Sequence, residues 1–259
     1  MTIRIRFARF LLRLGAFIQT LPVVVMRPDD LVEFSRQSYA KPGNVDAWAE
    51  SSLIESGLDS DEKALFEKVP LVGGELLLLG VGGGREAIPL ANAGFDVTGV
   101  DYVPDMVTRA KENGLRHGVE IKGWVGDISN LDLSSSAFDV IWISRAMYSC
   151  VPTRQRRVQM LQQITQGLKP GGYFVCQFHC NQVWQEDGKS ARIRRMIANS
   201  PLGNRHYEKG DVLWLNVEFL HIFSSEDEIR SELEEGGMHV LNIRINERSF
   251  MGGAVCAKI

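Results

Sequence analysis

The chain has 259 residues, of which 44% are hydrophobic and 24% charged, and its formal net charge is −3. This composition is ordinary for a globular protein, and the acidic balance argues against a nucleic-acid-binding protein, which is usually basic. Four cysteines without the spacing of a small secreted scaffold indicate a reducing, cytoplasmic compartment, and because no 18 consecutive residues are apolar, no membrane-spanning helix is expected.

The first predicted element is a basic amphipathic helix over residues 3–21. Residues 1–27 carry five arginines and no acid, and apolar residues recur there at helical spacing. Such a helix either caps the substrate side of the domain or lies on an anionic membrane surface through residues 1–22, and both interpretations remain open. A cleaved signal peptide is disfavoured, because polar residues and Pro22 interrupt the apolar region.

Further short helices are expected up to residue 72, so residues 1–72 are predicted to form an N-terminal helical cap. From Glu75 onwards strands and helices alternate, which predicts an α/β core over 73–259 with a mostly parallel, doubly wound, seven-stranded sheet. A basic helical insertion is expected within 181–212. The predicted strands are 75–79, 95–100, 119–124, 138–143, 173–178 and 213–223, with 240–245 and 254–259 closing the sheet.

A glycine turn between two predicted strands is the most informative local pattern. The apolar run Leu76–Leu79 reads as a central strand, and Gly80, Gly82 and Gly84 follow it. Glycines there leave backbone N–H groups accessible to a ligand. The next strand ends in Asp101, about 20 residues on, where an acid can bind ribose hydroxyls. The unit therefore predicts a site for a nucleoside-containing cofactor.

The glycine spacing argues against a nicotinamide dinucleotide. The dinucleotide fingerprint places its third glycine at position 85, and this chain has Arg85 there. An NAD-dependent oxidoreductase is nevertheless kept as an alternative, because Asp101 would also suit the ribose of NAD.

Several motifs, in order along residues 70–259, resemble the class I S-adenosylmethionine-dependent methyltransferases. Their fold is Rossmann-like. Residues 77–84 are similar to the loop under the methionine part of the cofactor, and 99–102 to the motif whose acid holds the ribose. Residues 126–128 resemble the adenine-binding motif, 138–141 the fourth strand, and 168–172 the turn before the fifth. The resemblance implies S-adenosyl-L-methionine as cofactor, held by Gly80, Gly82, Gly84, Asp101, Tyr102, Met106, Asp127, Ile128 and Ser144.

One position departs from that family's pattern. The family usually has an acid two residues before the first glycine, and this chain has Leu78. That acid helps to position the amino-acid end of the cofactor, so Arg85, Glu86 or waters would have to replace it. A catalytically silent cofactor-binding protein is a second alternative.

Candidate catalytic residues are those near the carboxyl ends of strands four to six. Methyl transfer needs a general base only when the acceptor is protonated, and Tyr148, His179 and His221 are the candidates for it. Cys176, His179 and Cys180 look like a loose metal cluster, but in a strand His179 would point away from the two cysteines. No metal is therefore predicted.

The predicted partner is a small-molecule acceptor, bound between the N-terminal helices, the 144–152 loop and the 181–212 insertion. If residues 1–22 touch a membrane, the acceptor would be lipophilic and the protein peripheral to that membrane. The sequence identifies neither the methylated atom nor the oligomeric state.

Overall fold

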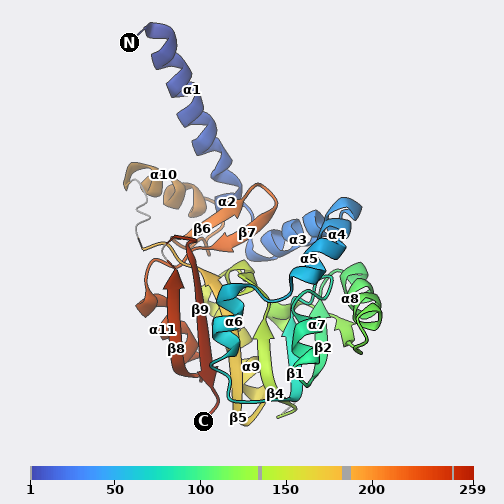
Figure 1. The fold of residues 1–259 in the computed structure, drawn as a ribbon. Helices are drawn as coiled ribbons and strands as arrows, with labels where there is room; N and C mark the ends of the chain where they lie inside the picture. The colour runs from blue at the N-terminus through green and yellow to red at the C-terminus, as the bar shows by residue number, and fades with distance from the viewer. Residues whose placement is uncertain (1, 134–135, 183–187, 247) are drawn as a thin grey trace.

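The computed structural model describes residues 2–133, 136–182, 188–246 and 248–259. Its centre is a seven-stranded sheet in the order β3-β2-β1-β4-β5-β9-β8, in which β9 runs antiparallel to both neighbours (Figure 1). The strands are β1 (Gly74–Leu79), β2 (Phe95–Asp101), β3 (Lys122–Val125), β4 (Phe138–Ile143), β5 (Leu168–His179), β8 (His239–Asn246) and β9 (Met251–Ala257). This confirms the predicted mostly parallel, doubly wound sheet.

The strand order reverses between β1 and β4. From β1 the chain moves outward to β2 and β3, then returns to β4 on the other side and continues to β5. In open α/β sheets, ligands bind outside the carboxyl ends of the strands at such a reversal. Ser144, which follows β4, donates its backbone N–H to the carbonyl of Leu79 at 2.9 Å. The turns after β1 and β4 therefore lie side by side.

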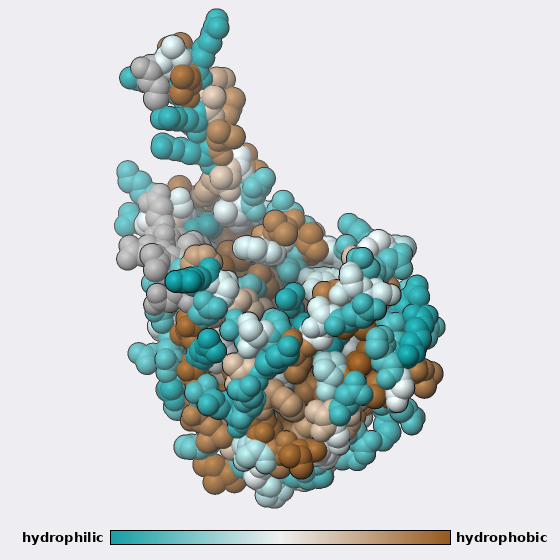
Figure 2. All heavy atoms as spheres, viewed as in Figure 1, coloured by the Kyte–Doolittle hydropathy of each residue, from teal (hydrophilic) through white to brown (hydrophobic). Residues whose placement is uncertain are grey.

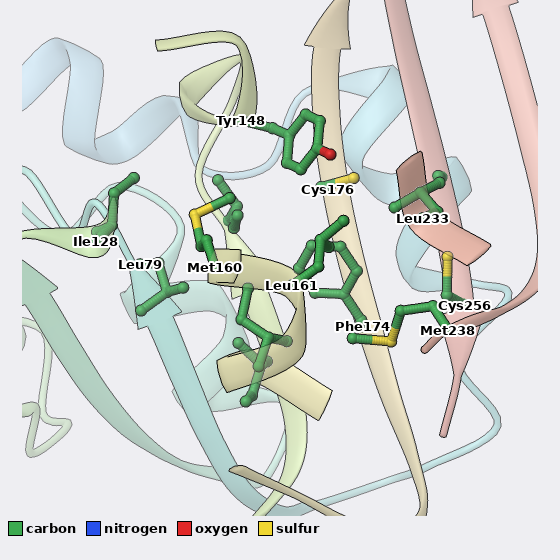
Figure 3. Close-up of a cluster of buried hydrophobic side chains, with 14 of the residues drawn as sticks. Leu79, Ile128, Tyr148, Met160, Leu161, Phe174, Cys176, Leu233, Met238 and Cys256 are labelled. Carbon is green, nitrogen blue, oxygen red and sulfur yellow. The ribbon is translucent and has the colours of Figure 1, made fainter. Parts of the chain in front are cut away.

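Two apolar cores, one on each face of the sheet, hold helices in place. Leu77 and Leu79 face the layer of α9 (Arg154–Gly167) and α11 (Glu226–Glu235), and Figure 3 shows Leu79 in this core. Leu76 and Leu78 face the layer of α6 (Ser60–Phe66), α7 (Ala87–Asn92) and α8 (Pro104–Arg116). The unbroken leucine run is explained by burial on both faces, which contributes about 1.5–3 kcal/mol per side chain.

The N-terminal cap consists of α2 (Leu21–Val25), α3 (Pro28–Tyr39), α4 (Pro42–Trp48), α5 (Ser51–Ser56) and α6. The α3 helix is fixed to the rest of the molecule because Ser35 Oγ accepts the N–H of Phe219 at 3.0 Å. Residues 42–56 form two short helices, α4 and α5, rather than one continuous helix. Glu50 is in extended backbone and serves as the N-cap of α5, so the helical path breaks there.

The basic amphipathic helix α1 (Ile3–Gln19) projects away from the rest of the molecule (Figure 1). It contains no buried residue. In this structure the helix does not cover the carboxyl ends of the strands, which lie under α3, α4 and α6 instead.

By length and composition, residues Ile3–Val25 could cross a membrane. An 18-residue window there has a mean hydropathy of 1.5, and 11% of it is buried. The sequence-based expectation of no spanning helix overlooked this segment because isolated arginines interrupt the apolar run while leaving its average hydropathy high. Buried core helices and signal sequences have similar composition, and the low burial excludes a core helix.

The strand predicted over 213–223 is instead a hairpin of β6 (Asp211–Trp214) and β7 (Glu218–His221), which forms a separate two-stranded sheet. Leu215 and Asn216 turn the chain with φ angles of +50° and +56°. Asparagine tolerates this left-handed backbone and favours tight hairpin turns. The helix predicted within the insertion is α10 (Gly188–Ala198), and residues 183–187 of the predicted insertion lie outside the described residues.

Candidate functional site

A cavity of about 470 Å³ opens at the carboxyl ends of the parallel strands. Its floor comes from the turn after β1 and from the ends of β2, β4 and β5. The 3₁₀ turn η2 (Met147–Cys150), the β6–β7 hairpin and helices α3 and α4 form its walls. The cavity thus lies where the strand order reverses. It is enclosed by the N-terminal cap, the 144–152 loop and part of the 181–212 insertion with its hairpin.

The glycine turn lies in this floor with its backbone exposed to the cavity. Gly80 has a φ of +82°, and a Cβ at this position would lie 1.9 Å from Met147 Sδ. Gly82 has a φ of +50°, and nothing lies within 4 Å of where its Cβ would stand. Glycine is required at Gly80 for close packing and at Gly82 for the backbone conformation, which leaves bare main chain for a ligand.

Asp101 lies beside the glycine turn with its carboxylate fixed by backbone donors. Oδ2 accepts the N–H of Gly82 at 3.0 Å, and Oδ1 accepts the N–H of Val103 at 3.0 Å. Burial raises the pKa of Asp101 above its ordinary value, although these two hydrogen bonds oppose the rise. Tyr102 and Met106 line the same part of the cavity. The predicted ribose acid and its neighbours are therefore together.

Asp127 and Ile128 line a small pocket that adjoins the cavity and shares Asp101 and Tyr102 with it. The carboxylate of Asp127 accepts the backbone N–H and the hydroxyl of Ser129, both at 2.8 Å. It therefore caps the 3₁₀ turn η1 (Ile128–Asn130) and faces the pocket from that cap.

Gly84 lies outside the cavity lining. Its φ is +99°, and a Cβ there would lie 3.3 Å from the Cα of Ala110 in α8. This glycine allows the turn to pack against α8, so its predicted contact with the cofactor is replaced by a packing role.

Leu78, at the position where the family usually has an acid, is fully buried in the core. An acid nevertheless reaches the cavity from the start of the next helix. Glu86 lines the cavity, and its carboxylate accepts hydrogen bonds from Ser144 Oγ and from Arg85 Nη2, the latter at 2.6 Å. Arg85 also donates to both carboxylate oxygens of Glu62, at 2.7 and 2.6 Å.

These charges are almost completely removed from water. Glu62, Arg85 and Glu86 are 0%, 5% and 3% exposed. Burial raises the pKa of Glu86, although Arg85 opposes the rise. Two carboxylates share one guanidinium, so the cluster carries one excess negative charge at the cavity edge when all three are ionised. The sequence offered Glu86 only as one of several replacements for the missing acid, because its sole signal was the polar pair Arg85 and Glu86 before an apolar helix.

Two of the three predicted catalytic residues lie outside the cavity. Tyr148 is fully buried, and its hydroxyl donates to Glu232 Oε2 at 2.9 Å, within the core of Figure 3. His221 is 1% exposed, with Nδ1 2.8 Å from Asp211 Oδ1. Neither side chain can reach an acceptor in the cavity, because both are buried outside its lining. The sequence could not reveal this, because loop and strand periodicity do not show which way these side chains point. Both predicted catalytic roles are therefore corrected.

His179 does line the cavity. Its ring stacks on Trp214 of the hairpin at a centroid distance of 6.2 Å, and burial lowers the pKa of His179, so the neutral form is favoured. Cys176 and Cys180 belong to the buried core instead. The expected strand alternation thus separates the histidine from the two cysteines.

Another carboxylate in the cavity was missed by sequence reasoning. Glu218, on β7, accepts the hydroxyl of Tyr39 in α3 at 2.7 Å and the thiol of Cys150 at 3.7 Å. All three residues line the cavity. Because 179 positions separate Tyr39 from Glu218, no local pattern could have paired them.

Three potential metal-ligand atoms lie within 4.8 Å of one another, in the side chains of Glu208, Asp211 and His221. Those atoms already have protein partners. Glu208 accepts from Arg157 Nη2 at 3.0 Å, and Asp211 accepts the N–H of Glu208 at 2.8 Å. The guanidinium of Arg157, which pairs with Glu208 and Glu232, offsets part of the negative charge that would attract a cation.

Comparison with known proteins identifies the central part of the chain. Residues 76–172 match the family model described as a methyltransferase domain. The ubiquinone biosynthesis O-methyltransferase of Xylella fastidiosa is 33% identical over 109 residues, which are 42% of this chain and 43% of that protein. The cypemycin N-terminal methyltransferase of a Streptomyces species is 33% identical over 103 residues, 40% and 41% of the two chains. The chain thus spans less than half the length of these relatives.

Solved structures resemble a larger part of the chain. An S-adenosylmethionine-dependent methyltransferase of Methanosarcina mazei has a TM-score of 0.60 at 21% identity, covering 78% of this chain and 99% of its own. One from Clostridium acetobutylicum has a TM-score of 0.60 at 15% identity, covering 83% and 98%. Residues 76–172 therefore match a methyltransferase domain, and the chain has the fold of the class I S-adenosylmethionine-dependent methyltransferases.

Proposed function

We propose that this protein is an S-adenosylmethionine-dependent methyltransferase that acts on a small-molecule acceptor. One observation carries the proposal: the carboxylate of Asp101 is held by the N–H of Gly82 at the edge of a cavity floored by bare glycine backbone. This geometry suits a nucleoside whose ribose hydroxyls donate to the acid while its remaining part lies over the turn.

The residues present fit that cofactor along the whole cavity. Asp101 would hold the ribose, with Tyr102, Met106, Asp127 and Ile128 around the adenine. Gly80, Gly82 and Ser144 would lie under the methionine part. Bound S-adenosylmethionine would supply an electrophilic methyl group, and the protein would contribute alignment and exclusion of water. The excess negative charge of the Arg85 cluster favours the amino group of the cofactor, which replaces the contribution missing at Leu78.

The alternatives differ in what they bind. An oxidoreductase would bind NAD(H), and this chain has Arg85 where a dinucleotide-binding turn has its third glycine. A silent protein would bind S-adenosylhomocysteine without any turnover. Calorimetric titration with S-adenosylhomocysteine and with NADH separates these cases: binding of NADH without S-adenosylhomocysteine would overturn the proposal.

The Asp101→Ala substitution tests the ribose contact. We expect S-adenosylhomocysteine to bind about 1–3 kcal/mol more weakly, because a charged hydrogen-bond acceptor is lost. Asp96→Ala, on the exposed side of the same strand, is the matched control and should leave the affinity unchanged. Equal affinity in both variants would exclude the ribose role.

The N-terminal helix supports a lipophilic acceptor and peripheral contact with an anionic membrane. α1 exposes large apolar side chains, including Phe7 at 61%, Phe10 at 57% and Leu12 at 73%, and it carries four arginines and no acid. In Figure 2 hydrophilic side chains lie along one side of the projecting helix and hydrophobic ones along the other. An apolar face beside cationic side chains suits the interface of a bilayer with anionic lipids.

Vesicle sedimentation tests this contact. The full chain should sediment with vesicles containing phosphatidylserine, and deletion of residues 1–22 should abolish sedimentation while S-adenosylhomocysteine binding persists. A variant with Arg4, Arg6, Arg9 and Arg13 changed to glutamine separates charge from apolar burial, and it should lose its preference for anionic vesicles. A full chain that never sediments with such vesicles would end the membrane proposal.

A further inference from the structure

Glu218 is a cavity carboxylate that the proposed cofactor site does not use. Glu218 projects from β7, in the hairpin next to His179 and Trp214, rather than from the turns that follow β1 and β2. Its Oε2 receives the hydroxyl of Tyr39 at 2.7 Å and the thiol of Cys150 at 3.7 Å. Among the described residues these are the hydrogen bonds shown for this carboxylate, so Oε1 remains available to a ligand.

The lining of the cavity is strongly acidic. Five carboxylates line it, against two guanidiniums. One of those guanidiniums, Arg85, is already paired with two buried carboxylates. With all of these groups ionised and His179 neutral, three negative charges are in excess among the lining residues, and Arg244, 3.9 Å from Asp61, offsets one of them. A negative site with low-dielectric walls attracts cations and excludes anions. The five acids are Asp59, Asp61, Glu86, Asp101 and Glu218.

Aromatic residues line the same cavity as Glu218. Tyr39 and Trp48 come from the cap and lie with ring centroids 6.3 Å apart, and Tyr102 directly follows β2. The faces of aromatic rings attract cations, most strongly where water is excluded. Acidic lining and aromatic walls together select for a positively charged organic group.

The geometry points to a small primary or secondary amine as the methyl acceptor, with Glu218 as the residue that binds its ammonium group and takes its proton. This inference rests on the proposed methyltransferase function and names the class of substrate for that site.

The proton and electron balance is simple. Glu218 accepts one proton from the ammonium group, which leaves a lone pair on nitrogen. That pair forms the new C–N bond, and the electron pair of the broken C–S bond goes to the sulfur of the donor, which becomes a thioether. The product is a methylated ammonium ion, and Glu218 returns its proton to solvent when the product leaves.

The surroundings of Glu218 suit a proton acceptor. Burial raises the pKa of Glu218 above its ordinary value, while the hydrogen bonds from Tyr39 and Cys150 lower it. Tyr102 is another titratable group that faces this cluster, and its pKa is also raised by burial. A base works best when its pKa lies nearer the working pH than that of an ordinary glutamate.

An acceptor panel with one hydrocarbon skeleton tests the substrate class. The full chain is incubated with S-adenosylmethionine and 2-phenylethylamine, 4-ethylphenol or 3-phenylpropanoate. We expect methyl transfer to the amine and, in calorimetry with S-adenosylhomocysteine present, binding of the amine in preference to the other two. Transfer to the phenol alone would overturn the inference and leave the methyltransferase function standing. Cofactor binding without transfer to any acceptor would overturn the inference as well.

The Glu218→Gln substitution tests the residue. We expect kcat/KM for the amine to fall about 10²–10⁴-fold and amine affinity to fall about tenfold or more, with S-adenosylhomocysteine affinity unchanged. Glu120→Gln, the same change on the exposed surface, should alter none of these values. If Glu218→Gln instead weakens S-adenosylhomocysteine binding, Glu218 belongs to the cofactor site and the inference is wrong.

Tyr39→Phe provides a readout that a purely structural role would not give. Activity requires ionised Glu218, so kcat/KM should rise with pH through the pKa of this carboxyl group. Removal of the Tyr39 hydroxyl takes away a hydrogen bond that lowers that pKa, so the acidic limb of the profile should shift to higher pH. An unshifted limb would contradict Glu218 as the proton acceptor.

Discussion

Arg85 occupies the position at which a dinucleotide-binding turn would have its third glycine, and the structure accounts for a large cation there. Its guanidinium lies between the carboxylates of Glu62 and Glu86 and also donates to the carbonyl of Gly57 at 2.6 Å. The residue thereby ties α6 of the cap to the start of α7. Replacing the cation would leave two carboxylates buried without a counter-charge, which costs far more than loss of an exposed ion pair.

The Arg85→Met substitution should lower the free energy of unfolding by about 3–5 kcal/mol, because the remaining carboxylates lose their partner. Urea denaturation at pH 7 measures the change. Arg109→Met is the control, since Arg109 is 43% exposed and 3.5 Å from Asp46, and it should cost less than about 1 kcal/mol. Equal stability of the two variants would show that the Arg85 network does not hold the cap to the sheet.

At the scale of secondary structure, α11 shows how a helix start depends on pH. The carboxylate of Glu228 accepts the N–H and hydroxyl of Ser224 at 2.7 and 2.8 Å, and Oε1 lies at an ion-pair distance of 3.5 Å from His221 Nε2. Burial alone would raise the pKa of Glu228, but these partners outweigh it and lower the pKa to about 2. The folded state therefore stabilises the ionised form of Glu228 relative to the unfolded chain.

Glu228 should contribute stability above about pH 4.5, the ordinary pKa, and that contribution should be lost as the pH falls towards 2. The side chain is 31% exposed, so we expect Glu228→Gln to cost only about 1–2 kcal/mol at pH 7. The difference from the unmodified protein should shrink as urea denaturation is repeated towards pH 3. Glu234→Gln, at an exposed position of the same helix, should show no such pH dependence. A pH-independent cost at Glu228 would contradict the lowered pKa.

The helices and strands of the core could be predicted from the sequence because burial on both faces leaves an unmistakable apolar run, as in Leu76–Leu79. The glycine turn and Asp101 could be predicted for the same reason, since they are local to those strands. The β6–β7 hairpin could not, because its residues 211–221 are apolar enough to read as one strand. Partners that meet only in the fold, such as Tyr39 and Glu218, leave no signal in sequence spacing.

On the scale of the whole molecule, α1 stands apart from the folded body. It contributes no buried residue, so deletion of residues 2–19 should change the free energy of unfolding by less than about 0.5 kcal/mol. Deletion through residue 40 removes α2 and α3 as well, and with them the buried side chains of Val23, Val24 and Leu31; it should lower the midpoint of thermal unfolding clearly. Thermal melts of the two truncated chains provide the comparison. A large loss on the shorter deletion would mean that α1 packs on the body after all.

The position of α3 couples the proposed cofactor site to the proposed acceptor site. Ser35 of this helix lines both the main cavity and the adjoining pocket of Asp127, while Tyr39 touches Glu218. The same helix thus borders both proposed ligand sites. When one ligand orders α3, the second ligand pays a smaller entropic cost to order it. Thermodynamic linkage then makes the cooperativity mutual: S-adenosylhomocysteine should tighten acceptor binding by the same factor by which the acceptor tightens S-adenosylhomocysteine.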